Sequence, residues 1–360
     1  MSTYQIPLGP VHAVLEEPIY FQLAVAEDKV TGVEIFAGYV HRGIEFLAMQ
    51  RNIYQNITLT ERVCSLCSNN HPFTYCMAVE KIAGITIPPR AAYLRIIADE
   101  SKRIASHLFN TGMLAHLAGA EDLFRQVMEI REVMQDLKEA VYGNRMNLSA
   151  NCVGGVRYDL SAEQIKFMRE SLNKIKKPVE EVTWCYRTEA AFRARTEGIG
   201  ILPPAVAAAC GVVGPVARGS GLAYDVRVDN PYAAYGELTV NAVVEQHGDV
   251  AARAMVRLQE IMASVDLLEQ ALSRLPDGPV CLPYMPEIPA GQTMAKSEAP
   301  RGELVYYLRT DGTDIPQRLK WRVPTYQNWE ALPVMLANSK VADVPLIISS
   351  IDPCVSCTDR

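Results

Sequence analysis

Strands are predicted at both ends of the chain, where short apolar runs flank turn signals. The predicted strands cover residues 19–25, 30–36, 302–310, 317–323 and 344–348. Glu27-Asp28-Lys29 separates the first two runs, and Asp311-Gly312-Thr313 separates the third from the fourth. Two apolar runs joined by a short polar turn are typical of a β-hairpin. We therefore expect a small sheet from each end of the chain.

The middle of the chain has the three- and four-residue apolar spacing of amphipathic helices. Long helices are predicted over residues 90–116, 121–142, from Ser161 onward, and over about 248–275. The Ser161 hydroxyl and the Gln164 side chain can form a capping box at the start of the third helix. A shorter helix is predicted over 326–337, whereas the Gly-, Pro- and Ala-rich stretch 198–235 predicts loops with short helices.

These patterns predict a mainly helical α+β fold, in which a core of long helices is flanked by small β-sheets from the N- and C-terminal segments. No internal repeat, low-complexity linker or change of composition marks a second domain. We therefore expect one domain over residues 1–360. Sheets built from both ends would also bring the two ends of the chain close together.

Composition and charge exclude several classes of protein. Apolar residues make up 49% of the chain and charged residues 21%, which is typical of a globular protein. A net charge of −6 without a Lys/Arg stripe gives no electrostatic footprint for nucleic acid. No apolar run approaches the roughly 20 residues that span a bilayer, and the start MSTYQIPLGP lacks a signal-peptide core. We expect a cytoplasmic protein that reaches a membrane only through partners.

Four of the nine cysteines form two C-x-x-C motifs, one near each end of the chain. Cys64 and Cys67 form the first motif, and Cys354 and Cys357 form the second. This spacing lets two thiolates meet at one metal, and clustered thiols in an intracellular protein are better explained as metal ligands than as disulfides. We expect one four-thiolate site that closes only when the fold is complete. The other cysteines are scattered, and we interpret them as small hydrophobic residues: Cys76, Cys152, Cys185, Cys210 and Cys281.

A structural zinc site is the main alternative, because four thiolates also suit zinc. Structural zinc sites usually separate their two Cys pairs by roughly 15–20 residues, whereas here nearly the whole chain lies between Cys67 and Cys354. A thioredoxin-like motif is disfavoured because neither pair lies in a βαβ pattern. His71 follows Cys67 by one helical turn, so it could share a helical face with Cys67 and donate a hydrogen bond to a metal-bound sulfur.

Taken together, the two motifs resemble those of the catalytic large subunit of nickel–iron hydrogenases. R-x-C-x-x-C-x-x-x-H at residues 62–71 and D-P-C-x-x-C-x-x-R at residues 352–360 match that family closely. Four further segments resemble the quinone-reducing large subunit of respiratory complex I, which shares the fold but lacks the four cysteines: 9–12, 41–45, 218–221 and 298–302. A hydrogenase with both likenesses resembles the membrane-bound, energy-converting branch. The short length and the ending Cys-Thr-Asp-Arg are similar to the Ech-type and CO-induced hydrogenases.

The resemblance implies how the four thiolates would divide between two metals. Cys64 and Cys354 would be terminal ligands of nickel, and Cys67 and Cys357 would bridge nickel to iron. The iron would carry one carbon monoxide and two cyanide ligands. Thiolates are soft donors, which suits this metal pair. The implied reaction is the reversible formation of H₂ from two protons and two electrons.

The resemblance also implies roles for side chains around the metals. Arg301 would place its guanidinium over the metal pair. Splitting H₂ into hydride and proton needs a Lewis acid and a base, and the Cys354 sulfur or Arg301 would be that local base. Glu17 matches the position of the proton-gating glutamate, since a desolvated carboxyl can have its pKa raised toward working pH. Glu16 is an adjacent competitor for this role.

One position departs from the family pattern. Many of these hydrogenases end the second motif in His, which helps to bind magnesium together with a Glu that corresponds to Glu45 here. This chain has Arg360 at that position. We expect an Arg360–Glu45 ion pair and little need for magnesium.

Once four cysteines hold the metals, the sequence contains no further motif for an electron carrier. The resemblance implies a small subunit with a [4Fe–4S] cluster, a ferredoxin-like iron–sulfur subunit and antiporter-like membrane subunits, assembled on the cytoplasmic face of the membrane. Ferredoxin would exchange electrons with this complex, and the membrane subunits would translocate ions. Two alternatives remain: a complex I-like electron-transfer or quinone-binding scaffold without nickel, and a zinc-stapled structural subunit.

Overall fold

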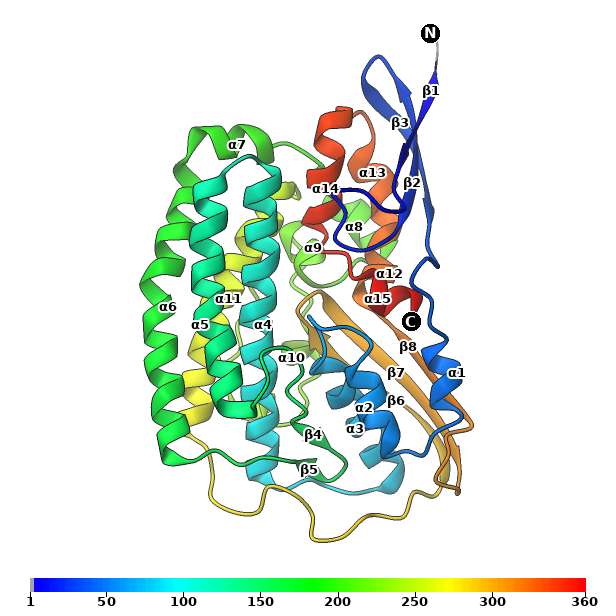
Figure 1. Cartoon of the computed structure of the whole chain (residues 1–360), viewed down its shortest axis with the longest axis vertical. Coiled ribbons are helices and arrows are strands. Elements are labelled where there is room, and N and C mark those ends of the chain that lie inside the picture. Colours follow the sequence, from blue (N-terminus) through cyan, green and yellow to red (C-terminus); the bar gives the residue numbers. More distant parts are fainter. Residues whose placement is uncertain (1–2) are drawn as a thin grey trace.

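A bundle of long helices occupies one half of the molecule, and small sheets with short helices occupy the other (Figure 1). The computed structural model describes residues 3–360. The long helices are α4 (Pro89–Leu117), α5 (Glu121–Tyr142), α6 (Ala162–Thr188) and α11 (Val250–Ser273). Each packs against two others, in the order α4, α5, α6, α11 and back to α4. Their apolar stripes share one buried core, so the predicted helical core is confirmed.

The starts of these helices follow from the local sequence. Pro89 occupies the first turn of α4, where its missing N–H is not needed. Ser161 caps α6 through the predicted capping box: the Gln164 N–H donates to Ser161 Oγ at 3.2 Å, and the Ser161 N–H donates to Gln164 Oε1 at 2.9 Å. Asp249 caps α11 by accepting from the Ala252 N–H at 2.8 Å.

Each end of the chain contributes a three-stranded antiparallel sheet. The strands pair in the orders β1 (Tyr4–Leu8), β2 (Tyr20–Ala26), β3 (Lys29–Phe36) and β6 (Ala290–Ala299), β7 (Gly302–Asp311), β8 (Arg318–Arg322). Both predicted hairpins are present, which confirms the α+β fold with sheets from both ends. β1 and β6 are not predicted, because Pro7 interrupts the first and the second has few large apolar residues.

Two predictions near the carboxyl end are wrong. Residues 344–348 form part of a helix, α14 (Val344–Ser350), and not a strand. A short apolar run that is buried on all sides has no periodicity to distinguish the two, and Pro345 fits the first turn of a helix. The predicted helix over 326–337 is divided into α12 (Pro324–Asn328), a 3₁₀ turn (Trp329–Ala331) and α13 (Leu332–Leu336). Pro333 cannot donate the hydrogen bond that a continuous helix would need.

The remaining elements are shorter than the four long helices. They are α1 (Ile44–Ala48), α2 (Gln55–Glu61), α3 (Asn70–Ala83), β4 (Asn151–Cys152), β5 (Gly155–Val156), α7 (Ala190–Thr196), α8 (Pro204–Cys210), α9 (Gly214–Gly219), α10 (Val226–Asp229), α15 (Val355–Asp359) and 3₁₀ turns at Tyr235–Glu237 and Val341–Asp343. The stretch 198–235 holds α8, α9 and α10, as predicted. A second hydrophobic core between α3 and the β6–β8 sheet contains the cysteines of both C-x-x-C motifs. Among the described helices, none has both the length and the apolar composition to cross a bilayer. That one domain spans the chain stays a prediction.

Candidate metal centre

The two C-x-x-C motifs meet at one buried point. Cys64 and Cys67 lie in the turn before α3, and Cys354 and Cys357 lie at the start of α15. The Sγ–Sγ distances are 3.4 Å within the first motif and 3.0 Å within the second. Between the motifs, Cys67 is 3.0 Å from Cys357 and Cys64 is 3.3 Å from Cys354. All four sulfurs lie within 4.8 Å of one another, so the predicted convergence is confirmed.

Four thiols this close together cannot all ionise unless a cation joins them. Hydrogen bonds from the neighbouring thiols, that of Cys354 foremost, hold the pKa of Cys67 well below its usual range. Burial raises the pKa of Cys357 well above its usual range. Negative charge on one sulfur therefore keeps protons on its neighbours. A thiophilic metal would displace those protons, and this donor set fits nickel, iron or zinc.

His71 contacts a sulfur of the site, but the sulfur belongs to the second motif. Its Nε2 is 3.3 Å from Cys357 Sγ, and its Nδ1 is 2.7 Å from Tyr306 Oη. The expected helical face shared with Cys67 is wrong, because α3 begins only at Asn70. Tyr306 fixes the orientation of the imidazole, which then directs its other nitrogen at the sulfur.

Arg301 is buried beside the sulfurs and is bound to the segment that leads into Cys354. Its Nε donates to Asp352 O at 2.7 Å, and its Nη2 donates to Asp352 Oδ1 at 2.6 Å. Its Nη1 donates to Ser106 Oγ on α4 at 3.3 Å. Two contacts with one residue fix both the position and the plane of the guanidinium.

A small cavity opens directly beside three of the four sulfurs. Apart from one guanidinium and one imidazole, its walls are mostly apolar. The lining residues are Cys67, His71, Ala299, Arg301, Leu304, Val323, Pro324, Thr325, Cys354 and Cys357. This small, mostly apolar space therefore adjoins the soft donor set directly.

Glu17 reaches the second motif. Its Oε2 accepts from the Ser356 N–H at 3.0 Å, and its other carboxylate oxygen accepts from the Ser356 hydroxyl. Part of the Glu16 side chain is exposed. Even so, desolvation of the Glu16 carboxyl by the surrounding protein raises the pKa of Glu16 to about 7, and the negative charge of Asp352 is the second cause. As the carboxyl that carries protons, Glu17 is favoured by its contact with the second motif, and Glu16 is favoured by its proton affinity near neutral pH.

The expected ion pair between Arg360 and Glu45 is present. Arg360 Nε lies 2.7 Å from Glu45 Oε1, and the pair is largely shielded from solvent. The same carboxylate oxygen accepts from the Trp321 N–H at 3.3 Å. The Arg360 guanidinium thus supplies a positive charge to Glu45, at the position where many members of the family are expected to bind magnesium.

Replacing Arg360 with His should create a response to magnesium that the natural chain lacks. The Glu45 carboxylate loses its cation, and a divalent ion that binds only the folded state then stabilises the protein. We expect added Mg²⁺ to raise the thermal midpoint of Arg360→His and to leave that of the natural chain unchanged. A rise in the natural chain that disappears in Glu45→Gln would contradict this interpretation.

The segments that resemble complex I also contribute to the site. Arg42 Nη2 donates to Val63 O and to Ser356 O, both at 2.8 Å, and so joins the two motifs. Arg218 Nη1 donates to Glu298 Oε1 at 2.9 Å, and both side chains are buried. These ion pairs and hydrogen bonds tie segments that are far apart in the sequence to one centre.

Helix α4 carries a buried polar face that sequence reasoning missed. Polar residues recur along it at three- and four-residue steps and therefore share one side of the helix. They are Asp99, Lys102, Arg103, Ser106 and Asn110, all of them buried. The sequence gives their polarity and spacing, but a solvent-exposed face would show the same pattern. Only the tertiary structure shows that this face packs against the metal centre.

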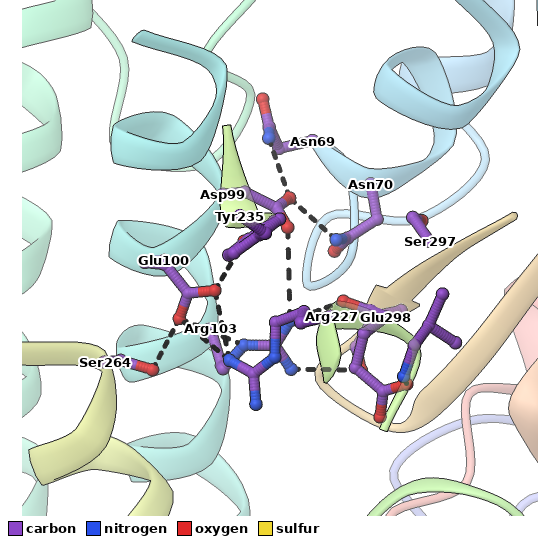
Figure 2. Close-up of polar contacts among 12 residues, drawn as sticks. Asn69, Asn70, Asp99, Glu100, Arg103, Arg227, Tyr235, Ser264, Ser297 and Glu298 are labelled. Carbon is purple, nitrogen blue, oxygen red and sulfur yellow. Dashed lines mark hydrogen bonds and ion pairs between the residues drawn. The ribbon is translucent and has the colours of Figure 1, made fainter. Parts of the chain in front are cut away.

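Each residue of this face contacts a segment of the site. Asp99 Oδ1 accepts from Asn69 Nδ2 at 3.0 Å and from Asn70 Nδ2 at 2.7 Å, just after the first motif (Figure 2). Arg103 donates to the Glu298 carbonyl, three residues before Arg301. The other three residues also bind segments of the site. Lys102 Nζ donates to Ser65 O at 2.8 Å, and Ser106 Oγ accepts from Arg301. Asn110 Nδ2 donates to Ser349 O at 2.9 Å. Helix α4 thus aligns both motifs and the Arg301 segment.

Replacing Asp99 with Leu should loosen the first motif. The change leaves the amides of Asn69 and Asn70 without an acceptor, at a cost of about 1–3 kcal/mol for each buried unsatisfied group. We expect a lower thermal midpoint and a lower metal content, measured by elemental analysis. The matched variant Asp99→Asn keeps an acceptor oxygen and should lose much less. Equal losses in the two variants would contradict a role for the acceptor.

Two protein families match parts of this chain that together cover residues 42–360. The nickel-dependent hydrogenase family matches residues 42–118, which include the first motif. The respiratory-chain NADH dehydrogenase 49 Kd subunit family matches residues 118–286 and 282–360. The chain belongs to the family that includes nickel-dependent hydrogenases and the 49 Kd subunit of respiratory-chain NADH dehydrogenase.

Individual relatives come from both sides of the family. Carbon monoxide-induced hydrogenase of Rhodospirillum rubrum is 57% identical over 100% of both chains. Membrane-bound hydrogenase subunit alpha of Pyrococcus furiosus is 36% identical over 99% of this chain and 87% of the relative. An NADH-quinone oxidoreductase subunit of Dehalococcoides mccartyi is 36% identical over 100% of this chain and 99% of the relative. The resemblance to membrane-bound hydrogenases and to complex I is confirmed.

Proposed function

We propose that this chain is the catalytic subunit of an energy-converting nickel–iron hydrogenase that interconverts H₂ with two protons and two electrons. The observation that carries the proposal is the meeting of four buried thiols from opposite ends of the chain within 4.8 Å. Complex I-type relatives share the family, so family membership alone does not decide the activity. The four converging thiols supply a soft donor set that suits nickel and iron.

The proposed ligands divide into two pairs. Cys64 and Cys354 would hold nickel, and Cys67 and Cys357 would bridge nickel to an iron with one carbon monoxide and two cyanide ligands. The sulfurs of Cys67 and Cys357 lie 3.0 Å apart, as do those of Cys354 and Cys357, so the proposed division rests on the positions of the cysteines in the two motifs. His71 would stabilise charge on the bridging Cys357 sulfur through its hydrogen bond.

When bound, the metal pair would supply the Lewis acidity and the redox change that heterolytic cleavage of H₂ needs. Asp352 holds the Arg301 guanidinium beside the sulfurs, where its positive charge favours thiolates over thiols. Of the two expected bases, the Cys354 sulfur would hold the first proton, because the Arg301 guanidinium already carries its own charge beside Asp352. Glu17, which binds Ser356 within the second motif, would then carry the proton away.

Electrons would have to leave through partner subunits. Within residues 3–360, the four-cysteine group is the one cluster of side chains that could hold a metal. We infer a small subunit with a [4Fe–4S] cluster, a ferredoxin-like subunit and antiporter-like membrane subunits, with ferredoxin as the electron partner. The name of the membrane-bound hydrogenase relative supports an assembly at a membrane. We infer that this chain lies on the cytoplasmic face, where the membrane subunits would couple the reaction to ion translocation.

Elemental analysis of the purified protein tests the proposal. We expect nickel and iron in equal amounts, together with infrared bands from iron-bound carbon monoxide and cyanide. Zinc without nickel would identify a structural site. No metal at the cysteines would favour the complex I-like scaffold, which the 36% identity to an NADH-quinone oxidoreductase chain keeps as the second candidate.

A further inference from the structure

Two cysteines outside the metal centre lie against each other. Cys152 ends β4, and Cys281 lies in the irregular segment 274–289 that leads from α11 to β6. Their Sγ atoms are 3.6 Å apart, which is contact between two sulfurs without a bond. Both thiols are free and only partly buried. These two cysteines are therefore not scattered singly, as the sequence suggested, but lie in contact.

Backbone pairing, and not a chance side-chain rotamer, brings the two thiols together. Cys152 pairs with Gly155 across the β4–β5 hairpin, and Gly155 also pairs with Cys281 in an isolated antiparallel bridge. The Val156 N–H donates to Val280 O at 2.9 Å. A Cβ at Gly155 would lie only 2.2 Å from Val280 O, so only glycine lets the two segments pack this closely.

A buried ion pair holds the hairpin that carries Cys152. Arg95 Nη2 donates to Cys152 O at 2.7 Å and to Gly155 O at 2.9 Å. Arg95 also binds Glu80 of α3, with 2.9 Å between Nη1 and Oε2. Cys152 therefore presents its thiol from a rigid support. Cys281 faces it from a segment that has no helix or strand beyond its bridge to Gly155, so this segment is the side that would move when the bond forms.

We propose that Cys152 and Cys281 form a redox-sensitive pair that closes into a disulfide when a small two-electron oxidant, a peroxide or a low-molecular-weight disulfide, reaches it. The site is separate from the metal centre and does not depend on the proposed hydrogenase activity. The supporting observations are the contact of the two sulfurs, their partial exposure and the backbone that fixes them.

The chemistry of closure balances with hydrogen peroxide as the oxidant. The Cys281 thiolate attacks one peroxide oxygen, the O–O bond breaks, and hydroxide leaves and takes up a proton to form water. The Cys152 sulfur then attacks the resulting sulfenic acid, the S–O bond breaks, and a second water leaves. The two thiols lose two electrons and the peroxide gains them. Burial raises the pKa of Cys152 to about 12, so the first attack falls to Cys281.

Closure would change how the segment 274–289 is held. This segment crosses one end of the molecule between α11 and β6 (Figure 1). It is tied to the hairpin by backbone hydrogen bonds, such as that from the Leu282 N–H to Gly154 O at 3.1 Å. A covalent link between positions so distant in sequence restricts the unfolded chain strongly and fastens the segment in place.

Peptide mapping tests the pair directly. The native protein, with any subunits that stay bound to it, is treated in separate arms with hydrogen peroxide and with oxidised glutathione. Remaining thiols are then alkylated under denaturing conditions, and the peptides are identified without reduction. We expect a peptide that links Cys152 to Cys281, lost in Cys152→Ser and in Cys281→Ser. Cys210→Ser removes a different partly buried thiol and should leave the link unchanged.

The two arms identify the oxidant, since a link in either arm supports closure by that reagent. Alkylation of both thiols after both treatments would overturn the proposal. So would sulfinic acid on one cysteine beside a free thiol on the other, or a stable glutathione adduct on Cys281 alone. Two separate serine variants guard against a misfolded one, because each should abolish the same peptide.

Discussion

Replacing Cys64 with Ser should empty the metal centre and reduce H₂ turnover to background. Cys64 is buried, and its Sγ lies 3.4 Å from Cys67 Sγ and 3.3 Å from Cys354 Sγ. Its loss therefore removes one of four converging sulfur donors. Serine is a hard donor with a high pKa and replaces a thiolate poorly at a soft metal. The loss should exceed the roughly 10–100-fold drop in metal affinity that outer-shell substitutions cause. Elemental analysis and H₂ evolution from a reduced dye measure the two effects.

A matched control separates loss of the ligand from loss of the fold. Cys76 is buried in α3, close in sequence to the first motif but outside the group of converging sulfurs. Cys76→Ser should keep most of the nickel and most of the activity. If Cys64→Ser retained nickel and iron at the level of Cys76→Ser, Cys64 would not be a ligand, and the proposed function would lose its main support.

The parts of the fold that the sequence predicts correctly, above all the long helices, depend on signals that lie within a few residues. The apolar stripes and caps of the long helices act within a few residues, as with Ser161 and Gln164, so the sequence shows them directly. The run 344–348 is the counterexample. Four of its five residues are buried within α14, so the run carries no periodicity, and the surrounding structure decides that it is a helix.

The candidate site was predictable in its ligands and less so in its surroundings. The two C-x-x-C motifs stand out as sequence patterns, whereas Arg301 was expected only from the family resemblance, and the structure gathers all of them at one point. The partner of His71 could not be predicted, because the contact with Cys357 depends on where α15 lies relative to α3. The buried polar face of α4 was missed for a related reason: spacing reveals a polar face but not what covers it.

The contact between Cys152 and Cys281 shows the same limit at longer range. Neither residue belongs to a motif, and 129 positions separate them. Their approach depends on the bare backbone of Gly155, which a sequence pattern does not reveal. A sequence motif predicts residues that act together because their spacing is local. A pair that only tertiary packing brings together can be found only in the structure.

Replacing Glu17 with Gln should suppress H₂ turnover by roughly 10²–10⁴-fold, the range that a positioned general acid or base contributes. The amide oxygen of glutamine can still accept from the Ser356 N–H, and its NH₂ can donate to the Ser356 hydroxyl oxygen, so the second motif should keep its shape and the metals should stay bound. What it cannot do is take up and release a proton. We therefore expect slow H₂ evolution and slow exchange between D₂ and water, both followed by mass spectrometry, at an unchanged nickel and iron content.

Glu16→Gln is the decisive comparison, because the two adjacent carboxyls differ in the properties that a proton carrier needs. The pKa of Glu16 is raised to about 7, which suits proton exchange at neutral pH, but part of its side chain already faces solvent. Glu17 is hydrogen-bonded to the backbone of the ligand segment itself, so we expect it to receive a proton released at the sulfurs. If proximity decides, Glu17→Gln is the severe variant and Glu16→Gln the mild one. The reverse order would assign the gate to Glu16. Comparable, severe losses would mean that the proton passes through both, from Glu17 at the motif to Glu16 at the surface.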